Sequence, residues 1–281
     1  MSSPTALHEG SWCTVQPELA RALTDARLQA HHAAQLVSAV GISYREPALD
    51  DSHTSMRWSA QRGGLSMDVG DDVSVALWLA ELTVTIARAG RQVAALTLSG
   101  RTMTDAEGLV RAALGRAGLE EGRYTTQRHF ELPPHPVADG RAFDVANGEG
   151  FGELARWFGA AAAALDETAR ERGGSAVVCW PHHFDLATLI TVAPGRTTGA
   201  GLSPGDGYYS EPYFYVNAHP SPPPDALTQY PLDGGGLWHT HEWVGAVLPG
   251  STLAAAAGAQ REQVRRFLHS ATGHTVSMLR R

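Results

Sequence analysis

Apolar residues recur at helical spacing in four parts of the chain. The first part runs from Glu18 to Val40, with Pro17 ahead of it and Gly41 just beyond. The other three cover residues 104–119, 151–173 and about 253–269. In each part the apolar side chains fall three and four positions apart, as they do on one face of a helix. The pattern therefore predicts four main helices, and Thr104 is the expected N-cap of the second.

Between these helices the pattern changes to short apolar runs rich in β-branched residues and separated by turn-forming residues. In the first part of the chain such runs cover residues 54–60, 64–69, 72–87 and 92–98, and in the second they lie between residues 176 and 248. Consecutive strands joined by short turns form antiparallel sheets, and helices then cover one face. The sequence predicts an α+β fold of largely antiparallel sheet flanked by four main helices.

The order helix, strands, helix occurs twice along the chain. A segment rich in proline and glycine, residues 132–150, separates the two occurrences. We expect a single compact unit spanning 1–281 with two similar halves, 1–132 and 151–281, because neither half has elements enough to bury its apolar faces well. No residue-level repeat relates the halves.

The composition is that of a globular protein. Hydrophobic residues make up 43% and charged residues 18% of the 281 positions. The formal charge of −7 offers no basic patch for a phosphate backbone, so we expect no nucleic-acid partner. The N-terminal residues lack the build of a secretory signal, and no apolar run reaches the ~20 residues that span a bilayer. We therefore expect a cytoplasmic protein without a membrane partner; the sequence indicates no oligomeric state.

The basic residues narrow the chemistry further. All of them are arginine, since the sequence contains no lysine. This excludes pyridoxal phosphate held on a lysine, other Schiff-base enzymes and a Walker-type nucleotide site. The glycines of "GLSPGDG" are typical of tight turns and lack the strand-to-helix context of a dinucleotide site, so no nucleotide cofactor is expected. The two cysteines, Cys13 and Cys179, form neither a disulfide framework nor a zinc-finger pattern, which suits a reducing compartment.

Two segments place ionisable residues in apolar surroundings: "CWPHHFDLATLITV", residues 179–192, and "GLWHTHEWVGAVL", residues 236–248. If each is a strand, side chains alternate between its two faces. His183 and Asp185 then point together while His182 points the other way. By the same rule, one face of the second segment carries His239, His241 and Trp243. One face of the intervening stretch "GDGYYSEPYFYVNAHP" carries Glu211, Tyr213 and Tyr215.

His183, Asp185 and His239 together resemble the ligands of a mononuclear metal centre. Two imidazoles and a carboxylate hold divalent iron with three open positions, or zinc with a water as the fourth ligand. A bulge at Pro181 would bring in His182 instead of His183. The chain would then be an enzyme acting on a small polar molecule, with Glu211 or Tyr213 as the proton-transfer partner. No arginine follows the distal histidine until Arg261, which argues against an oxoglutarate-dependent oxygenase.

Three other interpretations stay open. The His-Asp pair is often a structural cluster in which the carboxylate fixes the imidazole, and it also suits acid-base chemistry without a metal. The third is a non-catalytic small-molecule binding protein with an aromatic pocket rimmed by histidines. Its lining would comprise Trp180, Tyr208, Tyr213, Tyr215, Trp238 and Trp243, with Asp206 projecting from a loop. On the first helix, we expect His31 and His32 to be one half-buried and one solvated side chain.

Several short segments of this sequence together resemble those of a bacterial protein family of unknown function. They are "HHAAQLVSAVG", "DDSHTSMRW", "WPHHFDLATL", "GLSPGDGYYSEPYFYV" and "WHTHEWVGAVL", in this order, between about Leu28 and Leu268. The resemblance implies a single-unit architecture and a shared site, and brings no activity with it. The family pattern reads Trp-His-Thr-Glu-Gly-Trp where this chain has residues 238–243. The resemblance therefore favours His239 as a common ligand, with His241 replacing a carboxylate or serving this member alone.

Overall fold

The computed structural model describes residues 12–146 and 148–281, and these form two compact units. Unit 1 comprises Leu23–Ala155 and Cys179–Phe184, without residue 147. Unit 2 comprises residues 12–22, Arg156–Val178 and Asp185–Arg281. The residues of helix α3 (Gly148–Arg172) are divided between the two. The expectation of a single compact unit spanning 1–281 stays a prediction.

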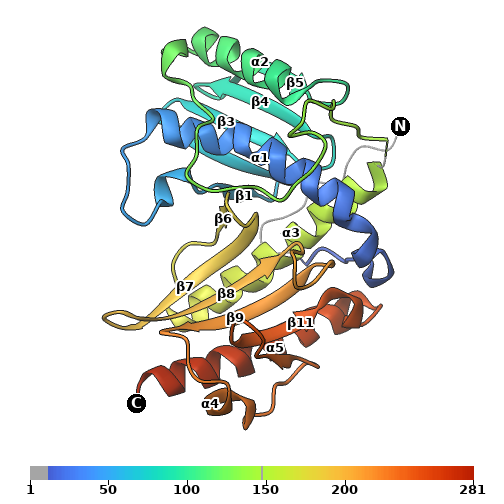
Figure 1. Ribbon diagram of the computed structural model, residues 1–281, viewed down its shortest axis with the longest axis vertical. Helices are drawn as coiled ribbons and strands as arrows, with labels where there is room; N and C mark the ends of the chain where they lie inside the picture. Colours follow the sequence, from blue (N-terminus) through green and yellow to red (C-terminus); the bar gives the residue numbers. More distant parts are fainter. Residues whose placement is uncertain (1–11, 147) are drawn as a thin grey trace. The chain divides into compact units, whose positions relative to one another are not determined.

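Unit 1 contains an antiparallel meander of five strands in the order β1-β2-β3-β4-β5. Their bounds are Arg57–Ser59, Gly64–Val69, Val73–Trp78, Thr83–Arg88 and Arg91–Thr97. Helix α1 (Thr24–Tyr44) packs on β2 and β3, and helix α2 (Met103–Arg116) packs on β4 and β5 (Figure 1). Every second residue of the central strands is apolar and fully buried, so the predicted strand alternation builds this core.

The second antiparallel sheet has the order β10-β11-β9-β8-β7-β6, and its strands belong to unit 2 except for Cys179 and Trp180 of β6. The strands, from β6 to β11, are Val178–Trp180, Asp185–Ala193, Arg196–Ser203, Tyr213–His219, Leu237–His239 and Gly245–Pro249. Helix α5 (Ala257–Leu279) packs along β8 and β9, and the short helix α4 (Asp225–Thr228) follows β9 (Figure 1). Short 3-10 turns occupy Pro17–Leu23, Ser52–Thr54, Glu121–Arg123 and Gly250–Thr252.

The two faces of the unit 2 sheet differ in chemistry. One face is apolar and packs on α5, where the Thr198 hydroxyl on β8 donates to the Thr275 hydroxyl. The strand registers assign a second set of side chains to the opposite face, which we name the open face. Its members on β7, β8 and β9 are Asp185, Ala187, Leu189, Gly199, Gly201, Ser203, Tyr213, Tyr215 and Asn217. Leu189 is 48% exposed, so solvent reaches this face.

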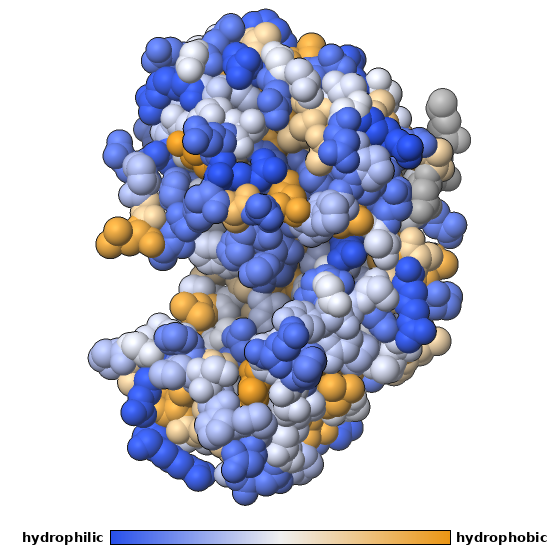
Figure 2. Space-filling model, in the orientation of Figure 1, coloured by the Kyte–Doolittle hydropathy of each residue, from blue (hydrophilic) through white to orange (hydrophobic). Residues whose placement is uncertain are grey.

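The fold class predicted from the sequence is confirmed: two antiparallel sheets with helices make an α+β fold. Within the described residues, no helix combines the length and apolar character that crossing a membrane requires. The residues tested for a secretory signal lie partly in 1–11, outside the described residues. In the view of Figure 2 the surface is mainly hydrophilic, with apolar residues in small separate patches.

Several predicted element limits are wrong. The first helix is α-helical only from Thr24, after a 3-10 turn, and the last extends to Leu279. The run 72–87 is two strands, because the chain turns at residues 79–82 and Leu82 adopts a positive φ of 43°. The N-cap of α2 is Thr102, whose hydroxyl accepts from the Asp105 amide while the Asp105 carboxylate accepts from the Thr102 amide.

Candidate functional site

Tyr215 makes the central contact of the open face. Its hydroxyl donates a hydrogen bond to Oδ2 of Asp185 on β7, although β8 lies between the two strands. The tyrosine ring passes over Gly201 of β8, where a Cβ atom would lie 2.5 Å from the ring and from its hydroxyl. Glycine leaves that space free, so the sequence of β8 allows Tyr215 to reach Asp185. Asp185 is buried at the base of this face.

Asp206 fixes the loop between β8 and β9. Its Oδ1 accepts from the backbone amides of Tyr208 and Tyr209 at 2.8 and 3.0 Å, and its Oδ2 accepts from the Tyr213 hydroxyl at 2.5 Å. A short acceptor side chain that binds amides two and three positions ahead stabilises a turn of this kind. The contacts of Asp206 thus hold a run of tyrosines in place.

The tyrosine hydroxyls at this site stay protonated over an extended pH range. Burial raises the pKa of Tyr213, and its hydrogen bond to Asp206 acts in the same direction. Burial likewise raises the pKa of Tyr209, with a smaller contribution from the negative charge of Asp206. Hydroxyls that keep their protons are hydrogen-bond donors, so the open face offers phenol groups rather than phenolates.

His239, at the end of β10, has both ring nitrogens engaged. Nε2 lies 2.6 Å from the backbone carbonyl of His241, which can only accept, so Nε2 carries the proton. Nδ1 is hydrogen-bonded to the Tyr209 hydroxyl at 3.0 Å. To bind a metal, His239 would have to give up one of these two hydrogen bonds.

Two aromatic rings lie beside this histidine. Trp243 stacks on His239 with ring centroids 4.4 Å apart. Tyr208 stands nearly perpendicular to both, at 5.4 Å from His239 and 6.3 Å from Trp243. We name these three residues the aromatic corner. The hydrogen bond between Tyr208 and Glu242 raises the pKa of Tyr208, so a carboxylate also belongs to this corner.

Glu211, a predicted proton-transfer residue, makes hydrogen bonds that hold the backbone in place. It precedes β9, so the prediction that it alternates with Tyr213 along a strand is wrong. Its carboxylate accepts from the Ser251 amide at 2.5 Å and from the Ser251 hydroxyl at 3.0 Å. Arg21 adds a contact of 3.4 Å. Glu211 therefore fixes the turn that follows β11.

The segment Pro181–Phe184 is a turn, so the prediction that His183 and Asp185 alternate along one strand is wrong. The Phe184 amide donates to the Trp180 carbonyl at 2.8 Å, and Phe184 adopts a positive φ of 57°, which ends the turn before β7 begins. His183 is exposed. His182 packs against the rings of Phe130 and Trp180, at 5.9 and 6.1 Å. Burial lowers the pKa of His182 to about 4.

His31 and His32 are both buried in unit 1, so the expectation of one half-buried and one solvated histidine is wrong. His31 donates from Nε2 to the Pro181 carbonyl at 2.8 Å and stacks on Phe184 at 5.1 Å. Burial lowers its pKa to about 3. His32 donates to the Pro133 carbonyl at 3.1 Å, and burial lowers its pKa as well. These contacts indicate that His31 and His32 stabilise the interior of unit 1.

The remaining predicted site residues are spread over the fold. Trp180 belongs to unit 1 with His182 and His183. Trp238 pairs with Ala246, on the face that packs on α5, and donates to the Tyr230 carbonyl at 2.8 Å. His241 is exposed in the loop after β10, so the strand alternation predicted for it is wrong.

The structure brings together a subset of the predicted residues in unit 2. That subset comprises Asp185, Asp206, Tyr213, Tyr215, His239 and Trp243. Within residues 12–146 and 148–281, no group of three or more His, Cys, Asp or Glu side chains is arranged to hold a metal ion.

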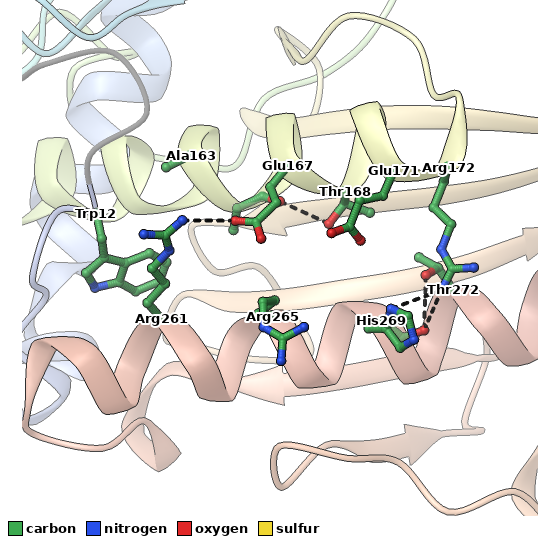
Figure 3. Close-up of a pocket in the computed structure, with 11 residues that line it drawn as sticks. Trp12, Ala163, Glu167, Thr168, Glu171, Arg172, Arg261, Arg265, His269 and Thr272 are labelled. Atoms are coloured by element: carbon green, nitrogen blue, oxygen red, sulfur yellow. Dashed lines mark hydrogen bonds and ion pairs between the residues drawn. The ribbon is translucent and has the colours of Figure 1, made fainter.

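Two hollows lie elsewhere. A groove between α3 and α5 is lined by charged residues, including an ion pair of 3.2 Å between Glu167 and Arg261 (Figure 3). Its side chains leave about 10 Å³, room for about one water molecule. In unit 1, a hollow of about 460 Å³ lies beside His32 and is lined mainly by residues of 126–138. The imidazole of His32 already uses Nε2 on the Pro133 carbonyl.

The sequence interpretation missed Gly199, Gly201 and Tyr209. A signal was present: in "GAGL" the glycines alternate with Ala200 and Leu202, so one face of β8 carries no side chain at these positions. Comparisons of the chain with models of known families, with curated proteins and with solved structures give no significant match.

Proposed function

We propose that unit 2 binds a small polar molecule on the open face of its sheet, without a metal. The observation that carries this proposal is the path of Tyr215 over Gly201 to Asp185. Glycine inside a strand costs about 0.5 to 1 kcal/mol relative to alanine. Two glycines on one face of a strand lower the stability of the sheet, but they leave space above the strand for other groups. Glycine in this setting marks a close approach by another group.

The chemistry of the open face suits a ligand with hydrogen-bonding groups. Tyr213 and Tyr215 supply hydroxyls, and Asp185 supplies a carboxylate at the base of the face. The aromatic corner supplies flat apolar surface. A few fixed polar groups beside aromatic rings are the usual make-up of a small-molecule site. Hydrogen bonds within the site hold these groups in place before a ligand arrives, which reduces the entropy lost on binding.

The test is a ligand-observed NMR screen with small polar fragments of mixed charge. Wild-type protein should bind some of them, and Tyr215→Phe should weaken these by about tenfold, since a lost hydrogen bond of about 1.4 kcal/mol corresponds to that factor. Asp185→Asn should weaken them as well. Thr85→Val is the matched control: it removes the hydrogen bond of 2.9 Å from the Trp78 indole on the sheet of unit 1.

All four proteins are first compared by thermal unfolding, so that only folded variants enter the screen. Fragments that bind wild type and Thr85→Val alike, and bind both open-face variants less, support the proposal. The proposal fails if no fragment binds wild type, or if every fragment that binds is indifferent to Tyr215→Phe and Asp185→Asn.

A further inference from the structure

We infer that the ligand of the open face is an organic cation, with its ammonium group held in the aromatic corner. This inference rests on the proposed function and names the class of molecule that the site takes. It follows from the charge of the segment that builds the site, from the arrangement of the rings and from the hydrogen bonds that fix His239.

The segment between Arg196 and Arg261 is acidic. It contains no arginine or lysine, and it contains five acidic residues: Asp206, Glu211, Asp225, Asp233 and Glu242. Arg196 at its start donates to the Leu279 carbonyl at 2.8 Å, at the end of α5. Glu211 pairs with Arg21, and Asp233 lies 3.8 Å from Arg266. The carboxylates that remain at the open face and the aromatic corner are those of Asp185, Asp206 and Glu242. Such a surface attracts cations and repels anions.

The aromatic corner has the geometry that recognises a cation. Tyr208 lies at 75° to the ring of His239 and at 68° to that of Trp243, so ring planes meet nearly at right angles. Tyr208 is 48% exposed, which leaves its ring accessible. An ammonium group near aromatic faces is attracted by their negative quadrupole. Glu242 places its carboxyl group beside the Tyr208 hydroxyl and 3.7 Å from the His241 imidazole.

His239 supports this assignment because its ring is held in place as part of the corner. Nε2 donates to the His241 carbonyl, and Nδ1 is hydrogen-bonded to the Tyr209 hydroxyl. These two hydrogen bonds fix the imidazole ring where it stacks on Trp243. The negative groups remain at the rim of the corner and at the base of the open face.

The probes are choline, its uncharged carbon isostere 3,3-dimethylbutan-1-ol, and butyrate as a small anion. Binding is followed through the indole N–H signal of Trp243 in ¹⁵N-labelled protein. We expect choline to bind at least tenfold more tightly than the isostere, because the two differ mainly in charge. Butyrate should bind more weakly than either, and added salt should weaken choline alone.

Variants assign the effect to the corner. Tyr208→Ala and Glu242→Gln should each weaken choline at least threefold and leave the isostere unchanged. Tyr230→Ala is the matched control, because Tyr230 stacks on His274 at 5.0 Å, a tyrosine-histidine contact with a residue of α5. It should leave choline binding unchanged. Each variant is melted first to show that it is folded.

The outcomes separate this inference from the proposed function. If neutral or anionic fragments bind the open face as well as choline does, the cation inference is overturned and the proposed function stands. The same holds if choline binding is indifferent to both Tyr208→Ala and Glu242→Gln. If neither choline nor any fragment of the screen binds wild-type protein, both fail.

Discussion

Replacing Gly201 with alanine should destabilise the protein, against the usual effect of this substitution in a strand. Alanine normally gains about 0.5 to 1 kcal/mol over glycine in a strand interior. Here the new Cβ atom would lie 2.5 Å from the Tyr215 ring and 2.6 Å from the Leu186 carbonyl oxygen. The ring has to move, and its hydrogen bond to Asp185 breaks.

The magnitude follows from two terms. A lost hydrogen bond to a charged group costs about 1.5 to 3 kcal/mol, and overpacking costs about 1 to 3 kcal/mol. With partial relaxation we expect a net loss of about 3 kcal/mol in the free energy of unfolding. Gly199→Ala is the matched control on the same strand. Its Cβ atom would meet the end of the Asn217 side chain, which can rotate away, so it should be neutral or slightly stabilising.

The assay is chemical denaturation followed by tryptophan fluorescence, with wild type, both alanine variants, Tyr215→Ala and the double variant Gly201→Ala/Tyr215→Ala. The part of the cost of Gly201→Ala that comes from the ring should disappear when Tyr215 is already alanine, while the contact of 2.6 Å with the Leu186 carbonyl oxygen remains. The coupling energy then measures the contact between Gly201 and Tyr215. If Gly201→Ala is as stable as Gly199→Ala, or if the cost is unchanged without the tyrosine ring, the proposed role of Gly201 is wrong.

Three further predictions concern other parts of the molecule. Burial lowers the pKa of His31 from about 6.5 in the unfolded chain to about 3 in the folded protein. The unfolded state therefore binds more protons below pH 6.5, and the free energy of unfolding should fall by on the order of 4 kcal/mol towards pH 3. Denaturant titrations of the His31→Gln variant should show a smaller loss. Glu211→Gln should lower the free energy of unfolding by about 1 to 3 kcal/mol. Glu167→Gln, which removes the partly exposed ion pair with Arg261, should lower it by less than about 1 kcal/mol. Equal melting temperatures of the two variants would contradict this contrast. Elemental analysis should find no stoichiometric iron or zinc, since both nitrogens of His239 are engaged; one metal per chain that is lost in His239→Ala and kept in His241→Ala would instead support the predicted metal centre.

Strand alternation predicted part of the site correctly. It assigned Tyr213 and Tyr215 to one face, and the register of β8 with β9 confirms this. It failed at Pro181–Phe184 because a turn closed by backbone hydrogen bonds has no signature in hydropathy, and because Phe184 adopts a left-handed conformation that favours glycine. Apolar spacing shows which residues are buried, and it does not show where a strand begins.

The burial of α1 was equally hard to predict. Its apolar positions suggest one buried face, but small residues such as Ala30, Ala33 and Ala34 are buried as well, so His31 and His32 are enclosed on a helix buried nearly all round. Alanine is often fully buried, but it is also the strongest helix former at exposed positions, so its presence does not show which faces of a helix are buried.

The most direct test of a site on the open face is chemical-shift mapping with the tightest fragment from the screen. Backbone amide shifts recorded during a titration of ¹⁵N-labelled protein should change in a cluster around Asp185, Gly201 and Tyr215, and the indole signal of Trp243 should follow the same binding curve. Shift changes confined to the unit 1 hollow beside His32, with the sheet of unit 2 unaffected, would contradict the account.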